Sequence, residues 1–393
     1  MSRRVEVVWE DDLTQYNFGP GHPMAPIRVE LTMRLARALG ALAHAGVEVV
    51  PSGYASDDLL TTVHTPQLLE AVKRCAADPS RMELEFGLGT DDNPCFLGMH
   101  DAGARIAAGT VEMAKAVLEG RADHGVNIIG GLHHAMPERA SGFCIYNDVA
   151  LAIRYLLDHG VERVAYVDVD VHHGDGVQHI FYDDPRVLTV SMHETPRTLF
   201  PGTGYPEEVG GPNAEGSAVN VALPPGTNDA GWLRAFHAVV PHVLREFRPQ
   251  ILVTQHGCDS HAEDPLAHLA KSVDGQRLAY EALHGLAHEL CQGRWVVTGG
   301  GGYAVVDVVP RAWTHLLAIV AGAPIVADTP VPDSWRAYVN ERLGRSAPFR
   351  MTDGATPTYP SWEDGYDPGD WLDRAVLATR KAVFPLYGLD PHW

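Results

Sequence analysis

The segment from Val164 to Gly176, VAYVDVDVHHGDG, places acids and imidazoles inside a run that is otherwise suited to a buried strand. Its valines and Tyr166 have the β-branched and aromatic bias of a parallel strand covered on both faces. Because a strand repeats every two residues, Asp168, Asp170 and His172 are predicted to point to one side. Carboxylates and an imidazole that converge away from water are costly without a cation. The segment therefore predicts a strand that carries a divalent metal site.

Strand-like runs alternate with helix-like runs along the rest of the chain, which predicts a parallel sheet wrapped by helices. We expect strands over residues 5–9, 126–129, 164–171, 187–191, 218–221, 251–255 and 295–298. We expect helices over residues 29–42, 101–118, 149–158, 232–247, 275–290 and 311–320. Because no repeat or low-complexity linker divides the chain, one domain is predicted. Residues 328–393, rich in proline and tryptophan, are interpreted as an extension that wraps this core, with a last helix capped by Asp370.

Glycine-rich polar motifs follow five of the predicted strands: GGLHHA, HHGDG, FPGTG, HGCDSH and GGGGY. In open α/β sheets, ligands bind beyond the carboxyl ends of the strands, where the connecting loops gather. The motifs are therefore expected at one edge of the sheet. The GGGGY motif, residues 299–303, lacks the lysine and the serine or threonine of a phosphate-binding loop, so it does not indicate a phosphate site.

Three residues of these motifs form a candidate set of metal ligands: Asp170, His172 and Asp259. Two carboxylates and one imidazole with an open coordination position suit a catalytic Zn²⁺ or Fe²⁺. The alternative is a cluster of polar groups that only hydrogen-bond to one another. Such a cluster is disfavoured because buried carboxylates are costly unless they are paired or bound to a metal.

A tandem pair of imidazoles, His133 and His134, follows two glycines that let the chain turn closely. Asp168 and Asp175 are acids of the central segment that remain available to orient this pair. An imidazole held by a carboxylate through one nitrogen has its other nitrogen available for proton transfer. This combination favours a catalytic role over a structural one.

Three aromatic residues accompany the polar motifs. Tyr303 ends the glycine run, and its hydroxyl could donate to a carbonyl oxygen that develops negative charge. Phe143 and Phe200 lie in glycine-containing loops and could form the walls of a narrow slot around an apolar side chain. The alternative for all three is ordinary packing in the core.

Net charge, cysteine spacing and apolar runs indicate which binding partners and which cell compartment the chain suits. The 50 acidic residues exceed the 30 basic ones, giving a formal charge of -20, which argues against a nucleic-acid surface and favours cationic partners such as lysine-rich segments or polyamines. The five cysteines have no paired spacing, so a reducing cytoplasm is expected. The start of the chain does not have the pattern of a signal peptide, and the longest apolar run is too short for a membrane span, so no membrane role is expected.

Six motifs together resemble the zinc-dependent histone deacetylase family, specifically its bacterial acetoin-utilization branch. They occur in the family's order: GGLHHA, SGFCIYND, DVDVHHGDG, FPGTG, GCDSH and GGGGY. The resemblance extends from the GHPMAPIR segment at Gly21 over roughly four fifths of the chain. It implies a single three-layer α/β domain of the arginase/deacetylase type with an eight-stranded parallel sheet. Residues 1–327 are accordingly assigned as the deacetylase catalytic domain, and residues 328–393 as its extension.

The resemblance also implies a role for each motif residue. The metal ligands would be Asp170, His172 and Asp259, holding Zn²⁺ or Fe²⁺. Asp168 would orient His133, Asp175 would orient His134, and Tyr303 would act as the electrophilic tyrosine. The remaining roles are substrate binding by Asp92, Gly142, Phe143, Phe200, Leu266 and Gly301, and an inner K⁺ or Na⁺ site formed by Asp168, Asp170, His172, Ser191 and Met192. His256 and His261 are additional imidazoles near Asp259 that are not expected to bind the metal.

The activity implied by the resemblance is hydrolysis of N-ε-acetyl-lysine in a cytoplasmic protein, possible substrates including acetyl-coenzyme A synthetase. His134 would take a proton from water and pass it to the leaving amine, while His133 would stabilise charge. Three alternatives stay open at the level of sequence. They are an acetylpolyamine amidohydrolase, a two-metal relative of arginase, and a module that binds acyl-lysine without cleaving it.

Overall fold

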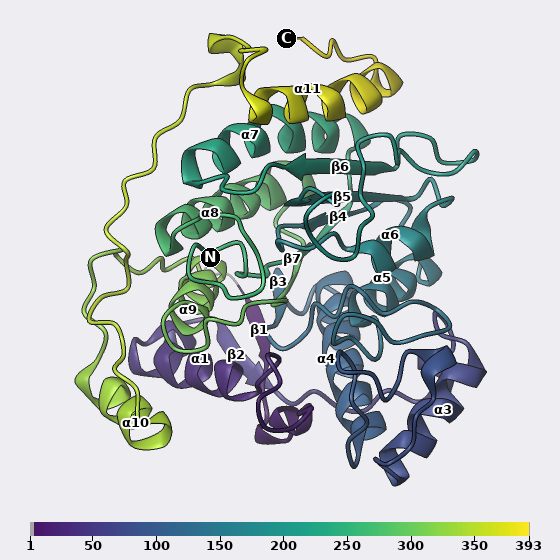
Figure 1. The fold of residues 1–393 in the computed structure, drawn as a ribbon, viewed down its shortest axis with the longest axis vertical. Helices are drawn as coiled ribbons and strands as arrows, with labels where there is room; N and C mark the ends of the chain where they lie inside the picture. The colour runs from purple at the N-terminus through teal and green to yellow at the C-terminus, as the bar shows by residue number, and fades with distance from the viewer. Residues whose placement is uncertain (1–3, 393) are drawn as a thin grey trace.

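Short runs dominated by valine and other apolar residues form the strands of one parallel sheet. The computed structural model describes residues 4–392, and its eight strands lie in the order β2-β1-β3-β8-β7-β4-β5-β6 (Figure 1). Each neighbouring pair is parallel. The strands are β1 (Val5–Val8), β2 (Val47–Val50), β3 (His124–Asn127), β4 (Val164–Asp168), β5 (Val187–Glu194), β6 (Ala218–Leu223), β7 (Ile251–Gln255) and β8 (Trp295–Thr298).

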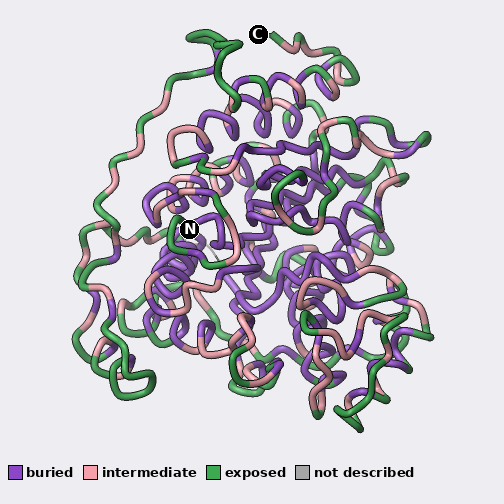
Figure 2. Tube along the Cα trace, in the orientation of Figure 1, coloured by how far each residue is buried: buried purple, intermediate pink, exposed green. Residues whose placement is uncertain are grey.

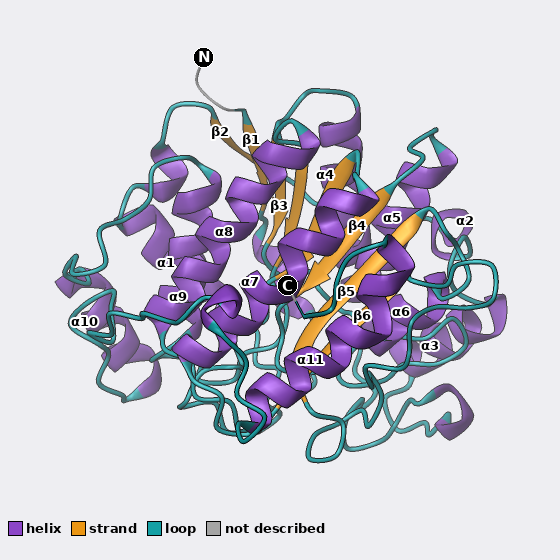
Figure 3. Cartoon of the chain, turned by 90° about the horizontal axis from the view of Figure 1, so that it is seen from above, coloured by secondary structure: helices purple, strands orange, loops and turns teal. Residues whose placement is uncertain are grey.

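Helices cover both faces of the sheet (Figure 3). They are α1 (Ile27–Ala38), α2 (Asp57–Leu60), α3 (Pro66–Ala77), α4 (Met99–Leu118), α5 (Asp148–Asp158), α6 (Asp175–Phe181), α7 (Asp229–Phe247), α8 (Val273–Cys291), α9 (Val309–Val320), α10 (Asp333–Leu343) and α11 (Trp371–Val383). Helices α1, α9, α8 and α7 contact one another in that order in one layer, and α4, α5 and α6 lie in the other. This confirms the three-layer α/β fold with an eight-stranded parallel sheet. None of the helices in residues 4–392 is long and apolar enough to span a membrane.

Each of the seven predicted strands overlaps an observed one, with bounds that differ by two or three residues in β3, β5 and β6, and the pattern fails at two places. Strand β2 was not predicted, because it lies at the sheet edge with half-buried and exposed residues and lacks the continuous apolar run of a central strand. Strand β4 ends at Asp168 and does not continue to Val171. The prediction that strand alternation points Asp168, Asp170 and His172 to one side is therefore wrong, since the last two lie in the loop that follows the strand.

The sequence pattern also missed the four-residue helix α2 and the helices α3, α6 and α10. The start of α3 has a recognisable signal, because Thr65 caps it by accepting a hydrogen bond from the backbone of Leu68, and Pro66 occupies its first turn. Helix α6 has only seven residues and α10 has few buried ones, so neither presents a long apolar stripe.

The central strands of the sheet are buried along their whole length (Figure 2). Their carboxyl ends carry polar side chains that are equally buried, among them Asp168 and Gln255. Because a buried polar group must be hydrogen-bonded or bound to an ion, this edge of the sheet demands a network of partners. The loops that bear the motifs supply it.

Residues 328–392 run across the helical layer from one end of the molecule to the other (Figure 1). Helix α10 packs on α1, where the indole nitrogen of Trp335 donates to the Leu31 carbonyl over 2.9 Å. Helix α11 packs against β6 and α7, and its first turn is capped by Asp370 as predicted. A buried ion pair between Arg234 and Asp373, 2.8 Å long, joins α7 to α11. The division after residue 327 stays a prediction.

Candidate active site and metal centre

Loops that follow five strands meet at the carboxyl edge of the sheet and line one narrow pocket of about 220 Å³. Each of these loops contributes a side chain to the lining. The five residues are His134 after β3, His172 after β4, Phe200 after β5, Leu266 after β7 and Tyr303 after β8. The pocket therefore forms at the place that parallel strand order predicts for a binding site.

Asp170, His172 and Asp259 form one compact group of buried donor atoms that all lie within 4.8 Å of one another. The Nδ1 atom of His172 lies 3.1 Å from Asp170 Oδ1 and 3.2 Å from Asp259 Oδ2. Strand β4 lies beside β7, so the loop that carries the first two residues meets the loop that carries the third. Two carboxylates and one imidazole at this separation match a transition-metal site with an open coordination position.

The electrostatics of this group favour a cation. Burial and the neighbouring Asp170 carboxylate raise the pKa of Asp259 to about 7. Burial alone would lower the pKa of His172, but its hydrogen bonds to the two carboxylates outweigh this effect and raise the pKa to about 10. A proton on His172 thus offsets part of the negative charge of two buried carboxylates. A divalent cation fits the same position, and its binding would release that proton.

Close backbone approach holds both carboxylates in place. A Cβ atom on Gly257 would lie 1.9 Å from Asp170 Oδ2, and one on Gly301 would lie 1.9 Å from Asp259 Oδ2. The Gly301 N–H donates to Asp170 Oδ2 over 2.8 Å, and the Val171 N–H donates to Asp259 Oδ1 over 2.9 Å. Only glycine fits at these two positions, and the carboxylate orientations are fixed before any ion binds.

His133 and His134 lie side by side, His134 in the pocket lining and His133 behind it, and each is held by one carboxylate. His133 Nδ1 donates to Asp168 Oδ2 over 2.7 Å, and His134 Nδ1 donates to Asp175 Oδ1 over 2.6 Å. The two Nε2 atoms are 3.0 Å apart. Tyr166 also donates to Asp168 Oδ2, over 2.6 Å, which fixes the carboxylate that orients His133.

The two imidazoles of this pair have opposite protonation preferences. Burial lowers the pKa of His133, but the carboxylates of Asp168 and Asp170 outweigh it and raise the pKa to about 9. Burial and the charge on His133 lower the pKa of His134 to about 4. At neutral pH the pair therefore carries a single positive charge. His133 carries the positive charge, while His134 is neutral and able to accept a proton.

Comparison with known proteins identifies this arrangement. A model of the histone deacetylase domain matches residues 22–320. The chain belongs to the histone deacetylase family. It is 40% identical over 350 residues to the acetoin utilization protein AcuC of Bacillus subtilis, covering 88% of this chain and 89% of that protein. It is 36% identical over 338 residues to the protein of the same name from Staphylococcus xylosus, covering 85% of this chain and 87% of that protein. The family assignment and its acetoin-utilization branch are thus confirmed.

The deacetylase motif GGGGY forms a loop that Arg28 holds from below. The buried guanidinium donates to the carbonyls of Gly300 and Gly302 over 2.8 and 3.2 Å. The N–H of Tyr303 donates to Asp264 Oδ2 over 2.8 Å. Burial raises the pKa of the Tyr303 hydroxyl well above its ordinary value, so this group is a proton-bearing donor at neutral pH.

The wall of the pocket contains five of the six residues expected to bind substrate: Asp92, Gly142, Phe143, Phe200 and Leu266. Phe143 packs edge-on against Tyr303 with ring centres 5.8 Å apart, and Phe200 packs edge-on against His134 at 5.1 Å. The sixth, Gly301, does not line this pocket, and its backbone N–H donates to Asp170 Oδ2. Leu199 also lines the pocket, and sequence reasoning missed it.

The two additional imidazoles are not part of the group formed by Asp170, His172 and Asp259. His256 Nδ1 donates to the Thr298 carbonyl over 3.1 Å, and burial lowers its pKa to about 3. His261 Nε2 donates to Asp353 Oδ2 of the extension over 2.9 Å. Both imidazoles therefore act in the packing of the loops around Asp259.

Residues of the expected monovalent-cation site also lie together. Asp168 and Ser191 are paired across β4 and β5, and Met192 is the next residue of β5. Asp168 Oδ1 accepts a hydrogen bond from the backbone N–H of Asp170 over 3.1 Å. The Ser191 hydroxyl donates to His193 Nδ1 over 2.8 Å, and burial holds the pKa of His193 well below its ordinary value. Ion binding at this position stays a prediction.

Three supporting residues escaped sequence reasoning: Arg28, Asp148 and Gln255. Asp148 accepts the backbone N–H groups of Gly131 and Leu132, at 3.0 and 2.7 Å, and so shapes the turn before the histidine pair. The Gln255 side-chain amide donates to Asp170 Oδ2 over 2.7 Å. Only their positions next to the motifs could have indicated them. Asp148 is the last residue of the SGFCIYND motif, and Gln255 is the last residue of β7, four residues before Asp259.

Proposed function

We propose that this family member hydrolyses the amide bond of N-ε-acetyl-lysine in proteins and releases acetate. The observation that carries the proposal is the narrow pocket, which lies between Phe143 and Phe200 and contains His134, His172 and Tyr303. An extended lysine chain matches such an aromatic slot, and its acetyl group would then lie at the ligand group. We propose Zn²⁺ or Fe²⁺ for that group because the donors are two oxygens and one nitrogen.

The chain's own residues would divide the reaction among them. When bound, the divalent ion supplies Lewis acidity, which polarises a carbonyl and lowers the pKa of water. The Tyr303 hydroxyl would donate to the acyl oxygen as it becomes anionic. Neutral His134 would accept the proton of the attacking water and deliver it to the amine nitrogen as the C–N bond breaks. Protonated His133 would stabilise the negative charge that builds up beside it.

The cellular context follows from the same reasoning. A chain with a formal charge of -20 attracts lysine-rich protein segments. We propose a cytoplasmic substrate protein, with acetyl-coenzyme A synthetase as a candidate, and a structural K⁺ or Na⁺ ion beside Asp168 and Ser191. The adjacent backbone carbonyls and carboxylate oxygens of that position would supply the hard ligands that such ions prefer.

The proposal is tested by measuring acetate release from an acetyl-lysine peptide after anaerobic reconstitution with Zn²⁺ or Fe²⁺. Turnover with either ion is expected, and its absence with both would refute the proposal. The variant Tyr303→Phe is expected to lose roughly 100-fold to 1000-fold in kcat with little change in KM, because a donor to an anionic oxygen acts mainly in the transition state. A variant with full kcat would refute only the role of the tyrosine.

A second candidate substrate is an acetylated polyamine. The observation that favours it is the exposed Asp92 at the pocket mouth, where a carboxylate could attract the free ammonium groups of such a molecule. Comparison of kcat/KM for acetylspermidine and for an acetyl-lysine peptide separates the two candidates. The protein-substrate proposal requires the higher value for the peptide.

A further inference from the structure

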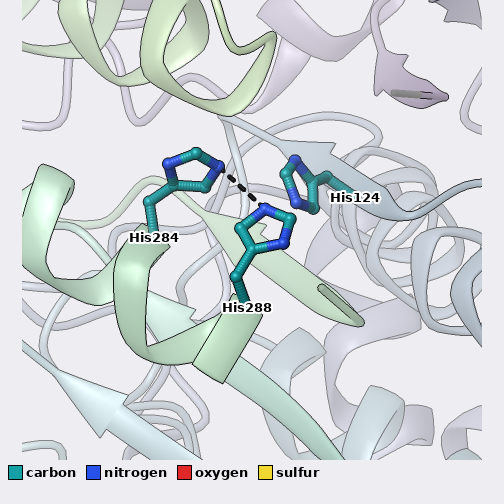
Figure 4. A group of neighbouring side chains, drawn as sticks. All are labelled: His124, His284 and His288. Atoms are coloured by element: carbon teal, nitrogen blue, oxygen red, sulfur yellow. Dashed lines mark hydrogen bonds between the residues drawn. The ribbon is translucent and has the colours of Figure 1, made fainter. Parts of the chain in front are cut away.

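A second group of imidazoles lies at the opposite edge of the sheet from the active site. His124 is the first residue of β3, and His284 and His288 lie near the end of α8. Since all strands are parallel and the active site follows their carboxyl ends, this group lies at their amino ends. Figure 4 shows the three rings facing a common point, two from one helix and one from the strand.

The separation of these rings matches a metal site. His284 and His288 are four residues apart on one helix, which places their side chains on the same face. Their Nε2 atoms are 3.1 Å apart, and the donor atoms of all three histidines lie within 4.8 Å of one another. Two nitrogens bound to one tetrahedral Zn²⁺ at about 2.1 Å would be about 3.4 Å apart. Small rotations of the rings therefore suffice to bind an ion.

His124 is oriented in the way that a metal-binding histidine requires. Its Nδ1–H donates over 2.8 Å to the carbonyl of Val320, the last residue of α9. This bond fixes the tautomer in which Nε2 carries the lone pair, and it also satisfies a carbonyl at the end of a helix. Ligating histidines generally have such a backbone or carboxylate acceptor on the other ring nitrogen.

The surroundings hold the rings and leave a route for an ion. Trp295 stacks on His284 at 5.6 Å between ring centres and meets His124 edge-on at 5.4 Å. Gly293, with φ at 81°, passes so close that a Cβ atom there would lie 2.9 Å from His288 Cε1. His124 is buried, whereas His284 and His288 are half-exposed, so solvent reaches one side of the group.

We propose that His124, His284 and His288 form a second metal site, which binds a divalent first-row transition ion such as Zn²⁺ through three imidazole nitrogens. Three neutral nitrogen donors and a solvent-facing position suit Zn²⁺, Ni²⁺ or Cu²⁺ and disfavour Mg²⁺ or Ca²⁺, which require oxygen ligands. The ion would join α8 to β3 and to the end of α9. It acts on stability and not on the reaction, because it lies at the other edge of the sheet.

The test is the number of Zn²⁺ ions bound per full-length chain. Protein stripped with a chelator is equilibrated with Zn²⁺, freed of excess ion by gel filtration and analysed for metal. The expected result is two ions for the wild type and one for the double variant His284→Ala/His288→Ala, with hydrolytic activity unchanged. The matched control is His159→Ala, which removes an exposed histidine just after α5 and is expected to retain two ions.

A double variant that binds as many Zn²⁺ ions as the wild type would overturn the proposal, whatever number the active site binds, and would mean that the rings are only hydrogen-bonded to one another. If the double variant does not fold, His288→Gln carries the same expectation. A complementary variant, Asp170→Ala/His172→Ala, removes two active-site ligands. Its X-ray absorption spectrum with Zn²⁺ is expected to show nitrogen ligands at about 2.0–2.1 Å and no carboxylate ligand. These outcomes do not depend on whether the protein is a lysine deacetylase.

Discussion

Replacing Arg28 tests whether the position of the GGGGY loop limits catalysis. The guanidinium is buried and donates to the carbonyls of Gly300 and Gly302 at 2.8 and 3.2 Å. In Arg28→Met both carbonyls lose a charged donor and stay buried. Each loss is expected to cost about 1–3 kcal/mol, so the free energy of unfolding should fall by about 2–6 kcal/mol.

The expected loss of kcat follows from the two residues next to these carbonyls, since Gly301 lies between them and Tyr303 comes directly after them. Gly301 donates its N–H to Asp170, and Tyr303 lines the pocket, so a shift of the loop would displace the proposed metal ligand Asp170 and the proposed donor Tyr303 together. A displacement near 1 Å is expected to lower kcat roughly 100-fold. KM should change much less, because Phe143 and Phe200 belong to other loops. Arg28→Lys keeps the positive charge but lacks the planar guanidinium that donates to both carbonyls. Its kcat is expected to lie between those of Arg28→Met and the wild type.

The matched control is Arg234→Met, which removes another buried arginine that donates to backbone carbonyls, here those of Ser361 and Gly365. It should also lower the midpoint of thermal unfolding, but at temperatures well below that midpoint its kcat should equal that of the wild type. Steady-state kinetics with an acetyl-lysine peptide and thermal unfolding of the metal-loaded proteins measure both quantities. The reasoning is refuted if Arg28→Met keeps the wild-type kcat, or if Arg234→Met lowers kcat as much as Arg28→Met does.

Three further outcomes are expected. Burial lowers the pKa of His64 and of His315 to about 4, below their unfolded value near 6.5, so unfolding takes up protons between these pH values. Each residue should therefore lower the free energy of unfolding by about 1.4 kcal/mol per pH unit as pH falls from 6.5 to 4, which urea titrations at several pH values measure. Asp353→Asn should lower thermal stability at pH 7, because His261 and Arg311 hold the pKa of this carboxyl well below its ordinary range. The difference from the wild type should begin to shrink as the pH falls below about 4 and should vanish only below the depressed pKa of the folded state. Phe200→Ala should raise KM for an acetyl-lysine peptide more than it lowers kcat, since it removes a pocket wall and leaves the ligands in place.

The strands and the chemistry at their ends were predictable because both are local properties. Valine-rich runs such as those of β4 and β7 mark buried strands, and a buried strand that ends in acids or histidines marks a site. The edge strand β2 escaped because half-exposed residues carry a weaker pattern. The end of β4 was misplaced because valine continues beyond Asp168, although the Asp168 carboxylate accepts a hydrogen bond from the backbone N–H of Asp170 and the chain already turns there.

Contacts between distant segments could not come from periodicity. Asp259 lies near Asp170 and His172 only because β7 lies beside β4, and the order of strands in a sheet cannot be predicted from the sequences of the strands. The family resemblance supplied that contact. Arg28 lies 272 residues from Gly300, and nothing local in either segment indicates their hydrogen bond. Likewise, the spacing of His284 and His288 is visible on α8, but the fold alone brings His124 to them.

The C-terminal extension belongs to the structure of the site, although its sequence shows no catalytic pattern. Asp353 accepts the His261 Nε2–H at 2.9 Å and an Arg311 guanidinium N–H at 2.7 Å. The His261 carbonyl in turn accepts the N–H of Asp264, whose carboxylate accepts the N–H of Tyr303. The loop between Asp259 and Asp264 thus carries a proposed metal ligand at one end and a support for the tyrosine at the other, and the extension holds its middle through His261. A chain ended at residue 327 would retain every motif of the family and still lack this support.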